Sequence, residues 1–294
     1  MTSLRLHDDE FVTDAGLVRR LLAGQMPEWA ELPLTRIGLS GTMNQLYRLG
    51  DDLLVRLPRR ANAVEQLHFE RDWLPRLAPH LPVRVPEQVA LGSPGEGYPH
   101  EWAVYRYLDG EHPSVDDPGD TDALAEDLAA FVVAMRGLDP AGARGGYRTG
   151  PLSDRDDYVR EWAAKADGLV DASAVLRIWD EALTAPAWTG DPAWAHSDLL
   201  PGNLLVRDGR LTAVIDFGAA GAGDPCYDLT VAWNCLPIRS RRRFRDTAGL
   251  DDAAWARARG WAMTWVGGIA YYRETNPVMA EMGRRAVAEI IAEG

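Results

Sequence analysis

Two stretches decide the fold of this chain: His196-Ser197-Asp198-Leu199-Leu200-Pro201-Gly202-Asn203 and, further on, Ile215-Asp216-Phe217-Gly218. Between them, two short apolar runs flank Asp208-Gly209, a dipeptide typical of a two-residue hairpin turn. The first stretch therefore precedes the first strand of a β-hairpin and the second stretch ends its second strand. Both lie at the open end of the hairpin, opposite the turn, where we expect their polar side chains to meet.

The register of this ribbon predicts a metal site. With Asp208-Gly209 as the turn, Asn203 faces Val214, and Asp216 is its diagonal neighbour on the same face, about 7–8 Å away between Cα atoms. Mg²⁺ suits one or two protein oxygens and leaves its other positions to water and substrate phosphates. We predict that Asn203 and Asp216 bind Mg²⁺.

Asp198 lies in the loop that enters the ribbon. A carboxylate beside a metal-bound phosphate can orient a hydroxyl and accept its proton. A facial-triad iron site would need a second histidine after His196, and none of the other five histidines follows it. A hydrolase triad of adjacent His196, Ser197 and Asp198 cannot form the required relay.

The N-terminal part supplies a second group of candidate residues. Runs at 34–39, 45–49 and 53–57 predict three antiparallel strands, followed by a helix at about 61–77 and strands near 88–91 and 102–107. Glu70 lies on the apolar face of the helix, where a carboxylate needs a partner. Arg56 in the third strand is the natural partner, and its guanidinium can bind phosphate oxygens bidentately. The loop Ser40-Gly41-Thr42 can cover phosphates with its N–H and hydroxyl donors.

Beyond a Pro- and Gly-containing connector the periodicity becomes helical, with helices expected at about 154–169, 173–183, 251–272 and 277–292. We therefore predict an α+β chain: a small β-rich lobe over residues 1–107 and a larger helical lobe over residues 108–294. Clefts between such lobes commonly bind ligands.

Composition excludes several classes of protein. The net charge of −13 argues against a nucleic-acid partner. No apolar run is long enough for a membrane span, and the acidic start is unlike a secretory signal. Only Cys226 and Cys235 occur, which fits a reducing compartment. We expect a cytoplasmic monomer or homodimer with neither nucleic-acid nor membrane partners.

Taken together, these motifs resemble the aminoglycoside phosphotransferase family, antibiotic kinases with a two-lobed, protein-kinase-like fold. The likeness covers nearly the whole chain, and stretches such as Val55–Arg60 are similar to the macrolide-kinase and actinobacterial branches. It implies ATP- or GTP-dependent, Mg²⁺-assisted phosphorylation of a hydroxyl on a small natural product such as an antibiotic.

The resemblance also implies a role for each matching residue. Asp198 would be the catalytic base, His196 would brace its loop, and Arg56, oriented by Glu70, would contact the α- and β-phosphates. The hinge, at about residues 107–111, would follow the gatekeeper Tyr105 and read the purine through backbone groups of Arg106 and Leu108. This sequence departs from the family at Arg56, where most kinases have lysine, and at Ser197, where glycine is usual.

Substrate contacts are expected on the helical lobe. Its acidic side chains could receive ammonium groups and its aromatic side chains could line a pocket; the candidates are Asp154, Asp157, Glu161, Trp233, Tyr271 and Glu274. The arginines at 239 and 241–243 are expected in a solvated loop that could attract an anion.

Two other functions remain open at this point. One is a metabolic kinase acting on a choline-, sugar- or homoserine-like substrate. The other is a non-catalytic nucleotide-binding regulator, although such proteins commonly lose at least one residue equivalent to Asp198, Asn203 or Asp216.

Overall fold

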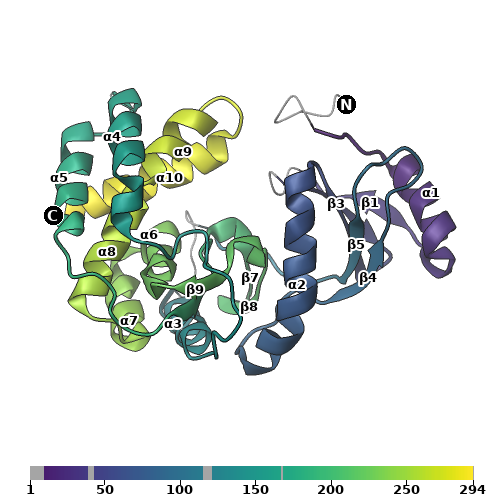
Figure 1. Ribbon diagram of the computed structural model, residues 1–294, viewed down its shortest axis with the longest axis horizontal. Coiled ribbons are helices and arrows are strands. Elements are labelled where there is room, and N and C mark those ends of the chain that lie inside the picture. Colours follow the sequence, from purple (N-terminus) through teal and green to yellow (C-terminus); the bar gives the residue numbers. More distant parts are fainter. Residues whose placement is uncertain (1–9, 39–42, 115–120, 167, 294) are drawn as a thin grey trace. The chain divides into compact units, whose positions relative to one another are not determined.

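The computed structural model describes residues 10–38, 43–114, 121–166 and 168–293 (Figure 1). The chain forms two compact units. The sheet unit comprises Met1–Pro79, Arg84–Gly110 and Ala213–Gly218, and the helical unit comprises His80–Val83, Glu111–Thr212 and Ala219–Gly294. A single boundary near residue 107 therefore does not describe the division fully, because residues 80–83 belong to the helical unit and residues 213–218 to the sheet unit.

The sheet unit is built on five antiparallel strands in the order β1-β2-β3-β5-β4. Their bounds are β1 Leu34–Arg36, β2 Asn44–Leu49, β3 Leu53–Pro58, β4 Gln88–Gly92 and β5 Trp102–Arg106. The first strand is shorter than the expected run 34–39, and residues 39–42 lie outside the described part of the chain.

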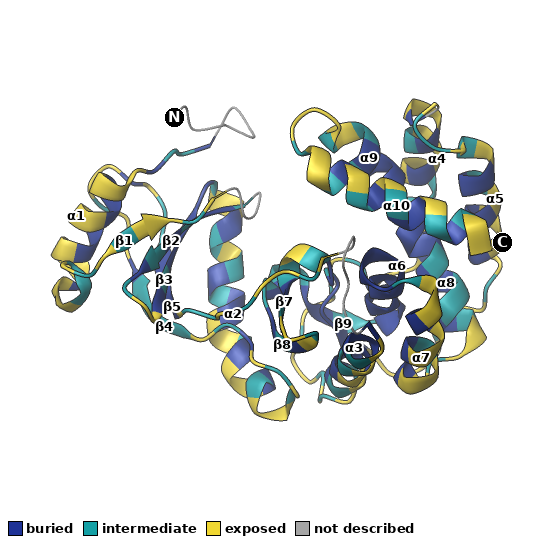
Figure 2. Ribbon diagram, turned by 180° about the vertical axis from the view of Figure 1, so that it is seen from behind, coloured by how far each residue is buried: buried dark blue, intermediate teal, exposed yellow. Residues whose placement is uncertain are grey.

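Helices cover both faces of this sheet. The helices are α1 (Ala15–Gln25) and α2 (Val64–Leu77), and α1 turns its buried stripe toward the sheet while its outer side is exposed (Figure 2). Because side chains alternate along a strand, Val55 of β3 packs in the α1 core while Leu54 and Arg56 point to the α2 side, beside Leu67. Strand parity thus places Arg56 against α2.

The segment Ala213–Gly218 joins the sheet unit through backbone pairing. Val214 donates its N–H to the carbonyl of Arg84 at 3.0 Å, and Arg84 and Ala213 form a parallel bridge. The Asp216-Phe217-Gly218 triplet is consequently part of the same compact unit as Arg56 and Glu70.

The helical unit carries most of the longer helices. They are α3 Thr121–Arg136, α4 Asp156–Lys165, α5 Ala172–Leu183, α6 Val231–Cys235, α7 Ile238–Ala248, α8 Asp252–Met263, α9 Trp265–Tyr272 and α10 Pro277–Glu293. Among them, α3 packs against α7, α5 against α8, and α9 against α10.

Short strands frame the loop at 196–203. Strand β6 (Ala193–Ala195) pairs antiparallel with β9 (Gly221–Gly223), and β7 (Leu204–Arg207) pairs with β8 (Arg210–Val214). Asp208 and Gly209 both have positive φ, 52° and 75°, as the predicted two-residue turn between β7 and β8 requires.

The N-cap of α1 is Asp14, whose side chain accepts the N–H of Leu17 at 2.7 Å. Two local expectations were wrong. The helix expected over 251–272 is broken at Thr264, whose hydroxyl bonds the carbonyl of Trp261 at 2.6 Å. The arginine-rich segment expected as a loop is helix α7.

Within the described residues, the helices are all too short or too polar to cross a membrane.

Candidate functional site

In the sheet unit, Arg56 is the centre of a buried polar cluster. Its Nη1 donates to Glu70 Oε2 at 2.8 Å and its Nη2 to Gln66 Oε1 at 2.9 Å. With its amide oxygen turned toward the guanidinium, Asn44 accepts from Nε and Nη2, each at 3.0 Å. Burial by itself would lower the pKa of Arg56, but Glu70, Tyr105 and Asp216 raise it by more. The guanidinium is therefore a fixed positive charge on the α2 side of the sheet.

Glu70 connects this cluster to the Asp216-Phe217-Gly218 triplet. Its Oε2 accepts from both Arg56 and the Tyr105 hydroxyl, the latter at 2.7 Å, and its Oε1 accepts from the N–H of Phe217 at 3.2 Å. The expected partner of Arg56 is thus present. The same carboxylate also holds the backbone of the triplet, which the sequence did not indicate.

Asp216 is set in a backbone conformation that side-chain residues rarely adopt. Its φ is 63°, and its Oδ1 lies 3.6 Å from Arg56 Nη2 while the side chain stays 37% exposed. Such strain is common where a side chain must be presented to a ligand. Next to it, Gly218 packs so tightly on the Gln66 side chain that an added Cβ would collide with it.

The expected hinge begins at the end of β5. Tyr105 is buried, and burial raises the pKa of its hydroxyl well above the ordinary value. The N–H of Arg106 is bonded to Glu87, and that of Tyr107 to Asp52, whereas in the described part of the chain Leu108 N–H meets no acceptor. Leu108 therefore offers an open backbone donor. The expected phosphate loop, Ser40-Gly41-Thr42, lies outside the described residues.

In the helical unit, Asp228 holds the loop at 196–203. Its carboxylate oxygens accept the N–H of His196 at 2.7 Å and of Ser197 at 2.8 Å. Burial raises the pKa of Asp228 to about 7, although these two hydrogen bonds lower it. The His196 ring is buried and lies edge-on against Phe131.

Ser197 has φ 64°, a left-handed conformation that favours glycine. Its hydroxyl is buried, and in the described part of the chain its oxygen meets no hydrogen-bond partner. Ser197, which stands where the resemblance implies glycine, thus has a backbone conformation that favours glycine.

Asp198 follows with a carboxylate that is fixed on both sides. Asn203 Nδ2 donates to the Asp198 carbonyl at 2.8 Å and to its Oδ2 at 3.0 Å, while Arg148 Nη1 reaches its Oδ1 at 3.0 Å. The Asp198 side chain remains 24% exposed. The carboxylate is therefore both oriented and accessible.

Arg148 is a further residue of this site that no sequence motif indicates. Its Nη1 also donates to the carbonyl of Ser197 at 2.7 Å, and its guanidinium lies between the rings of Tyr147 and Tyr227, 4.8 and 4.9 Å from their centroids. Burial lowers the pKa of Arg148, but Tyr227 and Asp198 raise it by more. No periodicity marks this residue, because it lies in a loop about fifty residues before Asp198.

The segment around Arg148 is held by close backbone contact. Tyr147 N–H bonds the Ala219 carbonyl at 3.1 Å, and Asp224 N–H bonds the Thr149 carbonyl at 3.0 Å. Gly221 lies so close to the backbone of Gly146 that a Cβ there would clash. This contact requires glycine and fixes the position of Arg148.

The donor atoms of Asn203 and Asp216 fit magnesium. Asn203 uses its amide nitrogen on Asp198, so the amide oxygen is the atom left for a ligand. Asp216 offers a carboxylate oxygen. Both are hard oxygen donors of the kind that Mg²⁺ prefers. The described residues contain no group of three or more His, Cys, Asp or Glu that could hold a metal.

Several expected substrate residues are already engaged. Glu161 pairs with Lys165 at 2.5 Å and Glu274 with Arg273 at 3.3 Å. Trp233 is 2% exposed and packs on Trp255, so it is a core residue and its assignment to the substrate is corrected. Asp154 and Asp157 are exposed, and Tyr271 is 51% exposed beside Tyr272.

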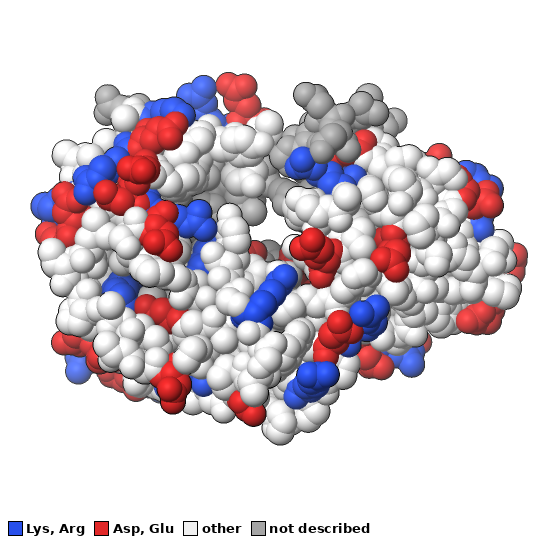
Figure 3. All heavy atoms as spheres, in the orientation of Figure 1, with Lys and Arg blue, Asp and Glu red and all other residues white. Residues whose placement is uncertain are grey.

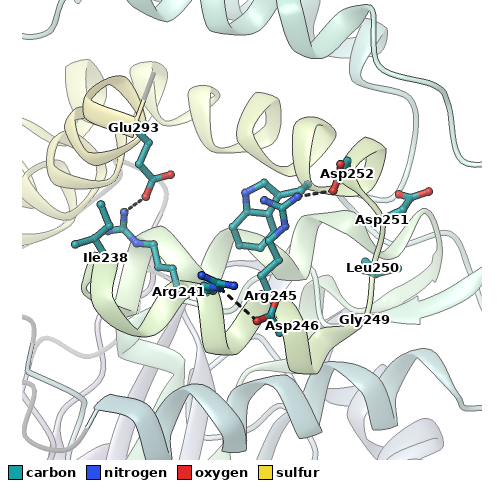
Figure 4. A pocket seen from close by; sticks show the side chains of 11 residues that line it. Ile238, Arg241, Arg245, Asp246, Gly249, Leu250, Asp251, Asp252 and Glu293 are labelled. Atoms are coloured by element: carbon teal, nitrogen blue, oxygen red, sulfur yellow. Dashed lines mark hydrogen bonds and ion pairs between the residues drawn. The ribbon is translucent and has the colours of Figure 1, made fainter.

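The arginines of α7 also differ from expectation. Arg241 is buried and pairs with Glu289 at 2.8 Å and with Glu293, while Arg245 pairs with Asp252 at 2.5 Å. They border a surface cavity of about 790 Å³ between α7 and α8 (Figure 4). Since carboxylates already neutralise these two arginines, this cavity is not an evident anion site.

Charges of both signs are intermingled on the face of the helical unit that Figure 3 shows. The net charge of −13 therefore does not gather on that face into a wholly acidic surface.

Comparison with known proteins identifies this arrangement. The sequence model of the phosphotransferase enzyme family matches residues 34–261. An aminoglycoside 3'-phosphotransferase of Escherichia coli is 32% identical over 96 residues, which are 32% of this chain and 31% of that protein. The chain thus matches only about a third of the length of this curated relative.

Solved structures match along nearly the full chain. The GDP complex of wild-type aminoglycoside 2'-phosphotransferase-IIIa has a TM-score of 0.76 at 21% identity, covering 96% of this chain and 99% of that one. Macrolide 2'-phosphotransferase MphH from Brachybacterium faecium has a TM-score of 0.62 at 22% identity, covering 93% and 97%. The prediction of an α+β chain with the kinase-like fold of this family is confirmed.

Proposed function

Because the chain belongs to the phosphotransferase enzyme family, we propose that it transfers the γ-phosphoryl group of ATP or GTP to a hydroxyl of a small molecule. The observation that carries this proposal is the state of Asp198: an accessible carboxylate oriented by Asn203, whose amide oxygen is left for a metal. An antibiotic is the acceptor that the relatives' names favour, since one is an aminoglycoside phosphotransferase and another a macrolide phosphotransferase.

In the proposed reaction, Asp198 aligns the acceptor hydroxyl and accepts its proton as the oxygen attacks the γ-phosphorus. The bond between the γ-phosphorus and the bridging oxygen breaks, and the nucleoside diphosphate leaves with that oxygen. Such transfer depends chiefly on positioning and on stabilising charge, so the rigid hydrogen bonds around Asp198 serve it directly.

Asn203 and Asp216 would hold Mg²⁺ in this proposal. When bound, the ion supplies charge neutralisation at the β- and γ-phosphates. Arg56, fixed by Glu70, would bind the α- and β-phosphate oxygens. Leu108 would offer its open N–H to the purine, and Tyr105, buried in β5, would be the gatekeeper.

The test is mass spectrometry of a panel of hydroxyl compounds incubated with the chain, Mg²⁺ and ATP or GTP. The panel holds aminoglycosides, macrolides, peptide antibiotics, nucleosides and metabolic alcohols. A gain of one phosphoryl mass that Asp198→Asn abolishes, and that the turn variant Asp208→Asn retains, supports the proposal. Asp208 is a matched control because it undergoes the same change in an exposed turn.

Two outcomes oppose it. Equal transfer by Asp198→Asn overturns the role of Asp198 as the base. Stabilisation by nucleotide, without transfer to any compound in the panel, favours instead a nucleotide-binding regulator.

A further inference from the structure

The donors of Arg148 are only partly used. Nη1 serves both protein acceptors, the Ser197 carbonyl at 2.7 Å and Asp198 Oδ1 at 3.0 Å. In the part of the chain that the structure describes, its Nε and Nη2 groups have no hydrogen-bond partner. Because a guanidinium is a planar fork, these remaining donors match two oxygens of a single anionic group.

Tyr147 forms a platform beside these donors. Tyr147 is 62% exposed. Arg148 lies 4.8 Å from the ring centroid and Arg155 lies 5.3 Å from it. Two guanidinium groups thus flank one exposed aromatic ring next to Asp198.

Other tyrosines surround the same place. Burial raises the pKa of the Tyr158 hydroxyl, which Arg155 and Arg148 lower, and burial likewise raises the pKa of Tyr272, with Asp198 raising it further and Arg148 lowering it. The Tyr158 hydroxyl packs against Gly267 of α9, where a Cβ would not fit, so α4 and α9 hold these rings together. The surface near Asp198 is therefore aromatic and carries arginine.

Asp198 pairs with Arg148 through Nη1 alone, at 3.0 Å, and the other carboxylates nearby do not offset the charge of Arg155. Asp224 pairs with Arg257 at 2.7 Å and Asp156 pairs with Arg160 at 2.9 Å. Asp154 and Asp157 are exposed, and within the described chain neither forms an ion pair with Arg155. The positive charge of Arg155 is therefore not offset by these two carboxylates, and its guanidinium lies over the Tyr147 ring.

We propose that Arg148, Arg155 and Tyr147 form an acceptor subsite that selects a hydroxyl compound bearing an anionic group, a carboxylate or a phosphate, and disfavours polycations. This inference rests on the proposed function and narrows its acceptor. Arg148 binds the anionic group through Nε and Nη2, the Tyr147 ring stacks on the body of the acceptor, and the hydroxyl is left for Asp198.

Four probes with one common frame test the subsite by binding alone. They are 4-(hydroxymethyl)benzoate, 4-(hydroxymethyl)phenyl phosphate, the neutral 4-(hydroxymethyl)benzamide and the cationic 4-(hydroxymethyl)benzylamine. Each is titrated into the full chain at millimolar concentration and followed by ligand-observed NMR. We expect at least one anionic probe to bind roughly tenfold more tightly than the benzylamine. The tighter of the two anionic probes distinguishes a carboxylate from a phosphate.

Matched variants locate the binding. Arg148→Gln should weaken the preferred anion roughly tenfold and Arg155→Gln roughly threefold, while the benzamide changes little. Arg177→Gln is the control, since among the described residues this exposed arginine of α5 forms an ion pair with Glu181 alone. Arg155→Gln keeps the test valid if the more buried Arg148→Gln fails to fold.

The proposal is overturned if the benzylamine binds as tightly as both anions, if neither anion binds, or if Arg155→Gln behaves like Arg177→Gln. Its failure is distinct from failure of the proposed function. Equal binding of anion and cation would leave phosphoryl transfer intact, whereas absence of transfer to every hydroxyl would leave a measured anion preference standing.

Discussion

Replacing Ser197 by glycine should stabilise this protein, although it removes a fully buried side chain. Ser197 holds φ 64° and buries a hydroxyl that, in the described part of the chain, has no hydrogen-bond partner. Both features cost free energy in the folded state, and glycine removes both.

The magnitude follows from three contributions. A side chain in the left-handed region costs about 1–2 kcal/mol. A buried hydroxyl without a partner costs about 1–3 kcal/mol. Against these, glycine loses about 0.5–1 kcal/mol through the greater freedom of the unfolded chain, and a small void forms where the side chain lay. We expect a net gain of about 1–2 kcal/mol in the free energy of unfolding.

The assay is urea unfolding, with the thermal midpoint as a second measure; a gain of this size raises the midpoint by roughly 2–6 °C in a chain of this length. Ser197→Ala removes the hydroxyl but keeps the Cβ, so its stability should lie between wild type and Ser197→Gly. Ser153→Gly is the control. Ser153 is exposed and has no positive φ, so glycine there should lower stability.

A Ser197→Gly variant that unfolds at lower urea concentration than wild type would refute this reasoning. So would a Ser197→Ala variant that gains as much as Ser197→Gly, because backbone strain would then contribute nothing.

Three further predictions concern the buried charges. Asp228 has a folded-state pKa of about 7, above its unfolded value of 3.8, so the stability it contributes is present at low pH and is lost as pH rises through 7. The difference in unfolding free energy between wild type and Asp228→Asn should fall by up to about 4 kcal/mol between pH 4 and 7, and a rise would contradict this. Glu70→Gln leaves Arg56 buried without its charge partner and should cost about 3–5 kcal/mol in urea unfolding; a cost near zero would show that Gln66 and Asn44 suffice. Arg56→Lys loses the forked contacts to these neighbours and should raise the KM for nucleotide roughly tenfold in the transfer assay, with kcat changing less; an unchanged KM would place Arg56 away from the phosphates.

Much of the site could be predicted because its parts are local. Strand alternation places Arg56 on the same side of β3 as Leu54, and helical spacing turns Glu70 toward it. The turn at Asp208-Gly209 is likewise encoded by two residues that tolerate positive φ. Each of these inferences needs only the geometry of one element and its neighbour.

Other parts could not be predicted. Arg148 reaches Asp198 from about fifty residues away because Gly146 and Gly221 let two backbones touch. The run of arginines around Arg241 predicts a solvated loop, but the structure buries Arg241 in a helix. Its burial could not be predicted because its partners, Glu289 and Glu293, lie in α10, far along the chain. Trp233 is a core residue because Trp255 covers it.

The sequence by itself thus determined the succession of strands and helix in the sheet unit, the turn at Asp208-Gly209 and the partner of Glu70, since these follow from local periodicity and turn chemistry. It did not reveal helix α7 or the break at Thr264. Only the tertiary structure decided what surrounds Asp198, which arginines are neutralised and which aromatic rings stay exposed. The physical reason is that burial and ion pairing depend on which surfaces meet, and residues far apart in the chain supply those surfaces.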